Sequence, residues 1–142
     1  MSAASYPDRR TSLHRDRLDM LRIMAVQRGD DPQREYVLLQ NHGPLRLGLR
    51  GHLLTDDIGL ENGDRERMYA FSDDAQIPSM AYVLLVTGSG KNGWYQDNDA
   101  RPVYCVYWNK AQPVWSKSNE AIHLMNVIHT KGPRSEGLVI TR

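Results

Sequence analysis

Three groups of residues suggest chemistry in this chain, and each lacks part of the pattern that its chemistry requires. Gly88-Ser89-Gly90-Lys91 resembles a phosphate-cradling turn, but Leu85 and Asn92 replace the first Gly and the Ser or Thr of that motif. Asp97-Asn98-Asp99 lacks EF-hand spacing, and the five histidines form no H-x-x-x-H or H-E-x-x-H pair. No serine lies in a G-x-S-x-G elbow. We therefore expect no catalytic residues, no metal site and no cofactor, and hence a protein that is not an enzyme.

The segment from Lys91 to Arg101 is the first candidate for binding, because its composition departs from that of its surroundings. It places Trp94 and Tyr95 between the basic residues Lys91 and Arg101 in a predicted exposed loop. Aromatic side chains on a loop supply large contact area at low entropic cost, and basic neighbours steer a partner. The alternative is that Trp94 only caps the end of the fold.

A second candidate surface lies on the predicted strand Glu35–Gln40. Val37 and Leu39 would point to one side of this strand, and Tyr36 and Leu38 to the other. A strand with one buried face alternates more cleanly between apolar and polar residues. We therefore expect Tyr36 and Leu38 to be covered by another protein or by a second copy of the chain.

Short apolar runs bounded by turn residues position both surfaces. They are rich in β-branched and aromatic residues and show no helical spacing, which predicts an all-β sandwich or barrel of roughly seven to nine strands. Thr55–Asp64 is predicted to be a loop, and Gly51 to bend the chain. Leu39, Val83, Val106 and Leu124 are the predicted core. The predicted strands are Leu21–Val26, Glu35–Gln40, Leu45–Leu49, Arg67–Phe71, Ala81–Thr87, Val103–Trp108, Glu120–Ile128 and Leu138–Thr141.

Composition is that of an ordinary globular domain. The 142 residues carry a net charge of +1 and no apolar run of the length that a membrane helix needs. Residues 91–142 hold seven Lys or Arg against four acids, enough for weak contact with nucleic acid but short of a basic stripe. The only cysteine, Cys105, is predicted to be a buried apolar residue. Residues 1–18 are predicted to be a flexible arm without a secretory signal, which favours a cytoplasmic location.

Five motifs in the same order give the region from about Asp19 to about Ile128 a resemblance to the lamin tail domain. His52 stands where that family usually has Trp, and Leu38 where it is commonly polar. The five motifs are Glu35–Asn41 (E-[FYW]-V-x-L-x-N), Leu49–Asp56 (L-x-G-W-x-L-x-D), Tyr69-Ala70-Phe71 (Y-x-F), the strand and Gly-rich turn Val83–Gly90, and Trp108–Trp115 (W-K-A-Q-x-x-W with one extra residue).

The resemblance implies an immunoglobulin-like β-sandwich of antiparallel strands over residues 19–142. It also implies a non-enzymatic protein-interaction or assembly module, in which a partner protein or a second copy is bound. One alternative is a nucleic-acid-associated domain, and a weaker one is an accessory domain to a nuclease or hydrolase. The coiled-coil rod of the lamins is absent from the sequence, so filament formation by the lamin route is not implied.

Overall fold

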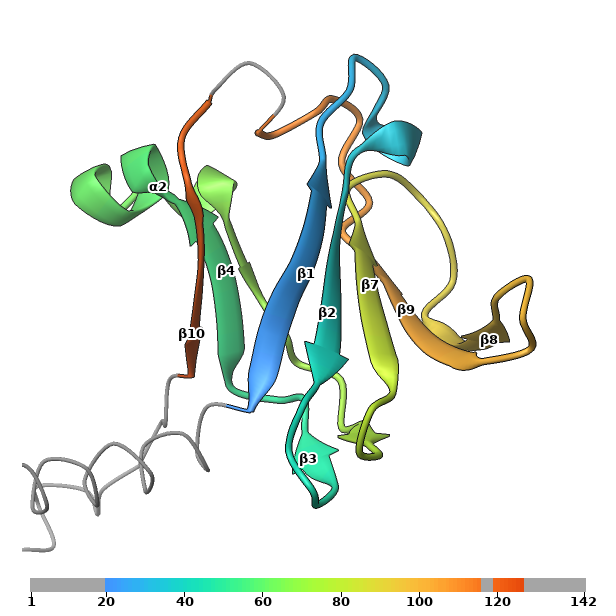
Figure 1. Ribbon diagram of the computed structural model, residues 1–142. Coiled ribbons are helices and arrows are strands. Elements are labelled where there is room, and N and C mark those ends of the chain that lie inside the picture. Colours follow the sequence, from blue (N-terminus) through green and yellow to red (C-terminus); the bar gives the residue numbers. More distant parts are fainter. Residues whose placement is uncertain (1–19, 116–118, 127–142) are drawn as a thin grey trace, which may run out of the picture.

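The computed structural model of the protein describes residues 20–115 and 119–126 (Figure 1). These residues are mostly β-strand with one short α-helix, in agreement with the predicted all-β class. The predicted arm, residues 1–18, and the predicted strand Leu138–Thr141 lie outside the described residues. Within the described part of the chain, no helix is long and apolar enough to cross a membrane.

Short elements follow one another closely along the chain. In order, they are β1 (Leu21–Gln27), the 3₁₀ turn η1 (Pro32–Arg34), β2 (Tyr36–Asn41), β3 (Leu47–Gly48), β4 (His52–Asp56), α2 (Asp57–Asn62), the 3₁₀ turn η2 (Arg65–Arg67), β5 (Met68–Ala70), β6 (Gln76–Ile77), β7 (Tyr82–Val86), β8 (Gly93–Gln96), β9 (Pro102–Tyr107) and β10 (Ile122–Asn126).

The largest sheet has five strands in the order β1-β2-β7-β9-β8 (Figure 1). β1 and β2 pair antiparallel, and a bulge interrupts their register between Ile23 and Ala25. β2 and β7 also pair antiparallel, with Leu39 opposite Val83. Leu39 of β2, Val83 of β7 and Val106 of β9 face the core and are fully buried, as predicted.

One pairing contradicts the predicted antiparallel arrangement: β7 and β9 run parallel, with Val83 opposite Tyr104. The antiparallel arrangement was an expectation from the resemblance to the lamin tail domain. The chain instead leaves β7, forms β8 at the edge of the sheet and returns as β9 between them. Because β8 and β9 are antiparallel neighbours, this return gives β9 the direction of β7.

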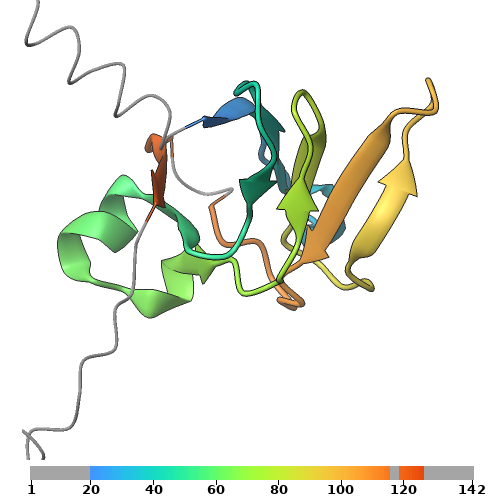
Figure 2. The same ribbon diagram turned by 90° about the horizontal axis from the view of Figure 1, so that it is seen from below.

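Two smaller sheets complete the core. β10, β4 and β5 form a three-stranded sheet, and β3 pairs with β6. Seen from below, the three-stranded sheet and α2 lie on one side of the molecule and β7, β9 and β8 on the other (Figure 2). Leu54 of β4 and Ile77 of β6 are fully buried in the same cluster as the residues of the large sheet. Leu124, predicted to be core, is only partly buried and packs against this cluster.

The prediction of a loop over Thr55–Asp64 is wrong, because β4 continues to Asp56 and α2 follows it directly. The Asp56 side chain caps the helix by accepting the N–H of Gly59 at 2.8 Å. Gly63 ends the helix in the left-handed conformation at φ 64°. Both boundary signals are present in the sequence, but the helix is too short for its apolar residues to show a period.

The predicted strand Leu45–Leu49 is largely a loop, of which only Leu47–Gly48 forms a strand. Leucines alternate with Arg46 and Gly48 along this segment, which predicts that Leu45, Leu47 and Leu49 share the buried side. Leu49 is buried, whereas Leu45 is 77 % exposed. The predicted bend at Gly51 is confirmed, since this residue adopts φ 97° in a turn. The alternating pattern continues into a bend of the chain, where it no longer indicates burial, so the side of Leu45 was predicted wrongly.

Candidate functional site

The outer face of the five-stranded sheet brings together half-buried apolar side chains from three strands. Tyr36 and Leu38 of β2 point away from the core, as do Tyr82 and Leu84 of β7. Leu38 lies opposite Leu84, which in turn lies opposite Cys105 of β9. A continuous apolar row therefore crosses the middle of this face.

A groove of about 430 Å³ lies along this row. Three of the six residues predicted for binding, Tyr36, Leu38 and Arg101, line it together. The sequence interpretation missed the other four, although Ala81–Thr87 is apolar in both phases just as Glu35–Gln40 is. These four are Tyr82, Leu84, Asp97 and Val103.

The rim of the groove carries a paired rather than a free charge. The guanidinium of Arg101 donates to Asp97 Oδ2 at 2.9 Å and to Asp99 Oδ2 at 3.3 Å, and it lies over the Tyr82 ring at 5.5 Å. The backbone N–H of Arg101, followed by that of Asp99 and the guanidinium, lowers the pKa of Asp97 despite an opposing effect of burial. Asp97 and Asp99 are therefore partners of Arg101, with their carboxylates on the solvent side of the sheet.

The other three predicted residues do not line this groove, because the predicted loop over 91–101 contains the strand β8. Strand alternation separates its two aromatic residues. Tyr95 lies opposite Val103 on the outer side, whereas Trp94 lies opposite Tyr104 and contacts its ring edge-on at 5.2 Å. Lys91 precedes β8, and its carbonyl accepts the Tyr95 hydroxyl at 2.7 Å. Trp94 is 46 % exposed, so the contact with Tyr104 covers only part of it.

In the Gly-rich turn after β7, the N–H groups of Gly88, Ser89 and Gly90 already donate to protein acceptors rather than pointing together at a phosphate site. Gly88 N–H donates to Pro32 O at 2.9 Å, Ser89 N–H to the Gln33 side chain, and Gly90 N–H to Asn109 Oδ1 at 3.3 Å. A Cβ on Gly90 would lie 2.5 Å from the Tyr107 ring. The glycines therefore serve close packing, as expected of a turn that ends a strand.

A buried carboxylate supports the strand that carries Tyr36 and Leu38. Glu35 is 1 % exposed, and it accepts the N–H groups of Val114 at 2.9 Å and Trp115 at 3.1 Å. The Thr87 hydroxyl donates to the same carboxylate at 2.6 Å. Glu35 thus fixes the beginning of β2 against the end of β7 and against the Trp108–Trp115 segment.

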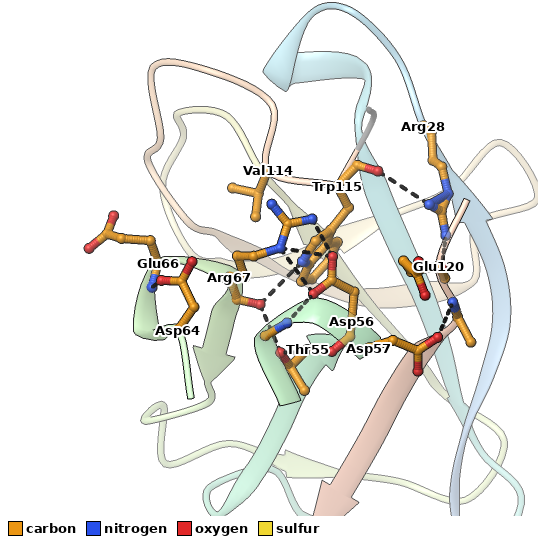
Figure 3. A network of polar contacts seen from close by, with 12 residues as sticks. Arg28, Thr55, Asp56, Asp57, Asp64, Glu66, Arg67, Val114, Trp115 and Glu120 are labelled. Atoms are coloured by element: carbon orange, nitrogen blue, oxygen red, sulfur yellow. Dashed lines mark hydrogen bonds and ion pairs between the residues drawn. The ribbon is translucent and has the colours of Figure 1, made fainter. Parts of the chain in front are cut away.

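A second polar cluster lies beside it, around Asp56 and Arg67 (Figure 3). Arg67 Nε donates to Asp56 Oδ1 at 3.1 Å and to Oδ2 at 3.0 Å, and the Arg67 carbonyl accepts the indole N–H of Trp115 at 3.2 Å. Burial acts against ionisation of Asp56, but hydrogen bonds from Arg67 and Gly59 outweigh it and lower its pKa. Both clusters are saturated with protein partners, which indicates a structural role.

His52, which stands where the lamin tail family usually has Trp, lies inside the fold. It is 2 % exposed, and Nδ1 lies 2.9 Å from the Leu49 carbonyl. A carbonyl only accepts, so Nδ1 carries the proton. Nε2 is buried and has no hydrogen-bond partner among the described residues.

Cys105 is buried in the middle row of the outer face, as predicted, and burial raises the pKa of its thiol. The thiolate is the reactive form, so both the burial of Cys105 and its raised pKa slow the reaction of the thiol with a reagent. We expect a disulfide reagent at neutral pH to label the folded protein at least about tenfold more slowly than the protein in urea. Equal rates would contradict this position of Cys105.

Where the structure describes the chain, no three His, Cys, Asp or Glu residues are grouped so as to hold a metal ion. Neither the scan against models of known protein families nor the search of curated proteins finds a match for this sequence. The candidate function therefore depends on the geometry of the outer face itself.

Proposed function

We propose that this chain is a non-enzymatic assembly module of lamin-tail type, an immunoglobulin-like sandwich that binds a second copy of itself through the outer face of its five-stranded sheet. The observation that carries the proposal is the groove where Tyr36 and Leu38 meet Tyr82, Leu84 and Val103. No other layer of the described residues covers this sheet face, and apolar residues on an open sheet face mark an interaction surface.

The composition of the groove suits an interface. Tyr and Arg are enriched among residues that dominate binding energy, and a central apolar row with a polar rim is the usual arrangement. Here Leu38 and Leu84 form the row, tyrosines flank it, and Arg101 with Asp97 forms the rim.

Charge at the rim favours a second copy as the partner. A two-fold interface requires a surface complementary to itself, and this rim carries both signs of charge side by side. Arg101 is 55 % exposed and Asp99 is 75 % exposed, so each can pair with its counterpart across a two-fold axis. A partner of one charge would instead meet a rim that is already neutralised.

Leu38→Glu tests the proposal, because a charge in the middle row opposes burial of that row by a second copy. We expect the natural chain to form dimers at high concentration in light scattering after size exclusion, and the variant to remain a monomer. Leu60→Glu, at a 45 % exposed residue of α2, is the matched control and should dimerise normally.

Two outcomes would overturn the proposal. A natural chain that stays monomeric at the highest soluble concentration excludes self-assembly, and a Leu38→Glu variant that still dimerises excludes this face. Leu84→Ser, a milder change in the same row, should also weaken dimerisation and guards against misfolding of the first variant. Far-UV circular dichroism should show the same β content in all variants.

The two alternatives from the sequence stay predictions, since no contact in the structure favours them. After residue 90, the described basic residues are Lys91, Arg101 and Lys110. Arg101 pairs with Asp97, and Lys110 pairs with Glu66 at 2.7 Å. Two of these three described cations are therefore already paired with carboxylates, whereas the other four Lys and Arg residues after residue 90 lie outside the described part of the chain.

A further inference from the structure

A second groove lies at the end of the sheet where the described chain begins. It encloses about 430 Å³ and is lined by Met20, Gly43, Pro44, Leu45, Arg46 and Leu47. Leu45 is 77 % exposed, the highest value among the large hydrophobic residues that the structure describes. This groove is separate from the one assigned to self-assembly, and it shares no residue with it.

The loop that presents Leu45 is held firmly in place. The amide of Asn41, which is fully buried, donates to the carbonyls of Leu45 at 3.0 Å and Ile77 at 2.9 Å. Its oxygen accepts the N–H of Gly43 at 2.9 Å, and the Ser79 hydroxyl donates to the Gly43 carbonyl. The exposure of Leu45 is therefore fixed by a buried hydrogen-bond network, and the groove is preorganised for an apolar group.

β1 begins beside this groove. The antiparallel pairing of Leu21 with Asn41 continues for one more residue, where His42 N–H donates to Met20 O at 2.9 Å. Met20 packs closely on Gly43, since a Cβ there would lie 2.7 Å from Met20 Cγ. Met20 therefore lines the groove at the point where the described chain begins.

We propose that this groove binds Leu18 and the residues just before it, from the same chain. Leu13 and Leu18 are the two leucines before Met20, and polar or charged residues surround both of them. Only Asp19 separates Leu18 from the groove-lining Met20, so an extended chain reaches the groove without any linker. Docking removes Leu18 and Leu45 from water together, and it extends the ordered fold into the N-terminal segment.

Limited digestion with trypsin tests this docking, because the segment carries arginines both near the groove and far from it. The docked chain holds the Arg17–Leu18 bond against the protein, whereas the Arg10–Thr11 bond lies seven residues farther out. We expect mass spectrometry to show that the first bond is cut at least about tenfold more slowly than the second. Leu45→Glu should make the two rates nearly equal.

Leu60→Glu is again the matched control, and it should leave the difference between the two bonds unchanged. Leu45 is so exposed that its substitution does not threaten folding, which circular dichroism will verify. Equal cleavage of both bonds in the natural chain, or a difference that survives Leu45→Glu, would overturn the proposal. Protection that disappears on dilution would also overturn it, because the groove of a second copy would then hold the segment. The digestion is repeated with Leu38→Glu, which disrupts the outer face. The difference between the two bonds should remain in this variant, because the docking does not depend on self-assembly.

Discussion

Glu35→Ala is expected to lower the free energy of unfolding by about 4 kcal/mol. The carboxylate accepts three hydrogen bonds, from Val114 N–H, Trp115 N–H and the Thr87 hydroxyl. A hydrogen bond to a charged group contributes roughly 1.5 to 3 kcal/mol, and partial relaxation of the site reduces the sum. The alanine would leave the buried Trp115 N–H without an acceptor, which is the most costly part of the change. Urea unfolding followed by tryptophan fluorescence measures the loss.

Two milder variants separate the contributions at this site. Glu35→Gln keeps the shape and one acceptor oxygen, and we expect about half of the loss. Thr87→Val removes a single donor and should cost about 1 kcal/mol. A loss below about 1 kcal/mol for Glu35→Ala would mean that the carboxylate does not hold the Trp108–Trp115 segment in place.

The strand that begins after Glu35 could be predicted from local pattern, but the role of Glu35 could not. E-Y-V-L-L-Q is β-rich and bounded by turns, so the sequence indicates a strand. The partners of the carboxylate, Val114 and Trp115, lie 79 and 80 residues away in the chain. No local spacing connects such distant positions, and an acidic residue at the beginning of a strand is more often exposed.

The outer-face groove could be predicted in part from the sequence, whereas strand β8 was missed. Tyr36 and Leu38 stand out because both phases of their strand are apolar, and β7 shows the same pattern in Tyr82 and Leu84. Trp94 and Tyr95 were grouped as neighbours on a loop. They lie in strand β8, where neighbouring side chains point to opposite faces. The loop prediction therefore did not separate Trp94 from Tyr95.

The parallel pairing of β7 and β9 was outside the reach of local pattern. Strand propensity and turn residues define each strand, but they do not state which strands pair. β8 lies at the edge of the sheet, beyond β9. Nothing in the sequence of the Gly88–Lys91 turn indicates this order. Fold class and most strands therefore followed from the sequence, whereas sheet order depended on contacts distant in the chain.

Asp56→Ala is expected to cost about 3 kcal/mol, because it removes the cap of α2 and leaves Arg67 without its carboxylate. Breaking a fully buried pair costs more, but the Arg67 side chain is 22 % exposed and water can replace part of the interaction. Asp56→Asn keeps the cap and should cost about 2 kcal/mol. Asp97→Asn, at the exposed pair with Arg101, is the control and should leave stability nearly unchanged, because water screens an exposed ion pair.

The pH dependence of the same variants identifies the ionised form of Asp56 as the source of this stability. Its pKa is lowered in the folded protein, so the unfolded chain takes up a proton first as the pH falls. The contribution is therefore complete above the pKa of the unfolded chain, at about 3.9, and is lost as the pH falls through the lower folded value. We expect the stability difference between the natural chain and Asp56→Asn to be constant above about pH 5 and to shrink below it. A difference that persists undiminished in strong acid would show that shape, and not charge, makes Asp56 necessary.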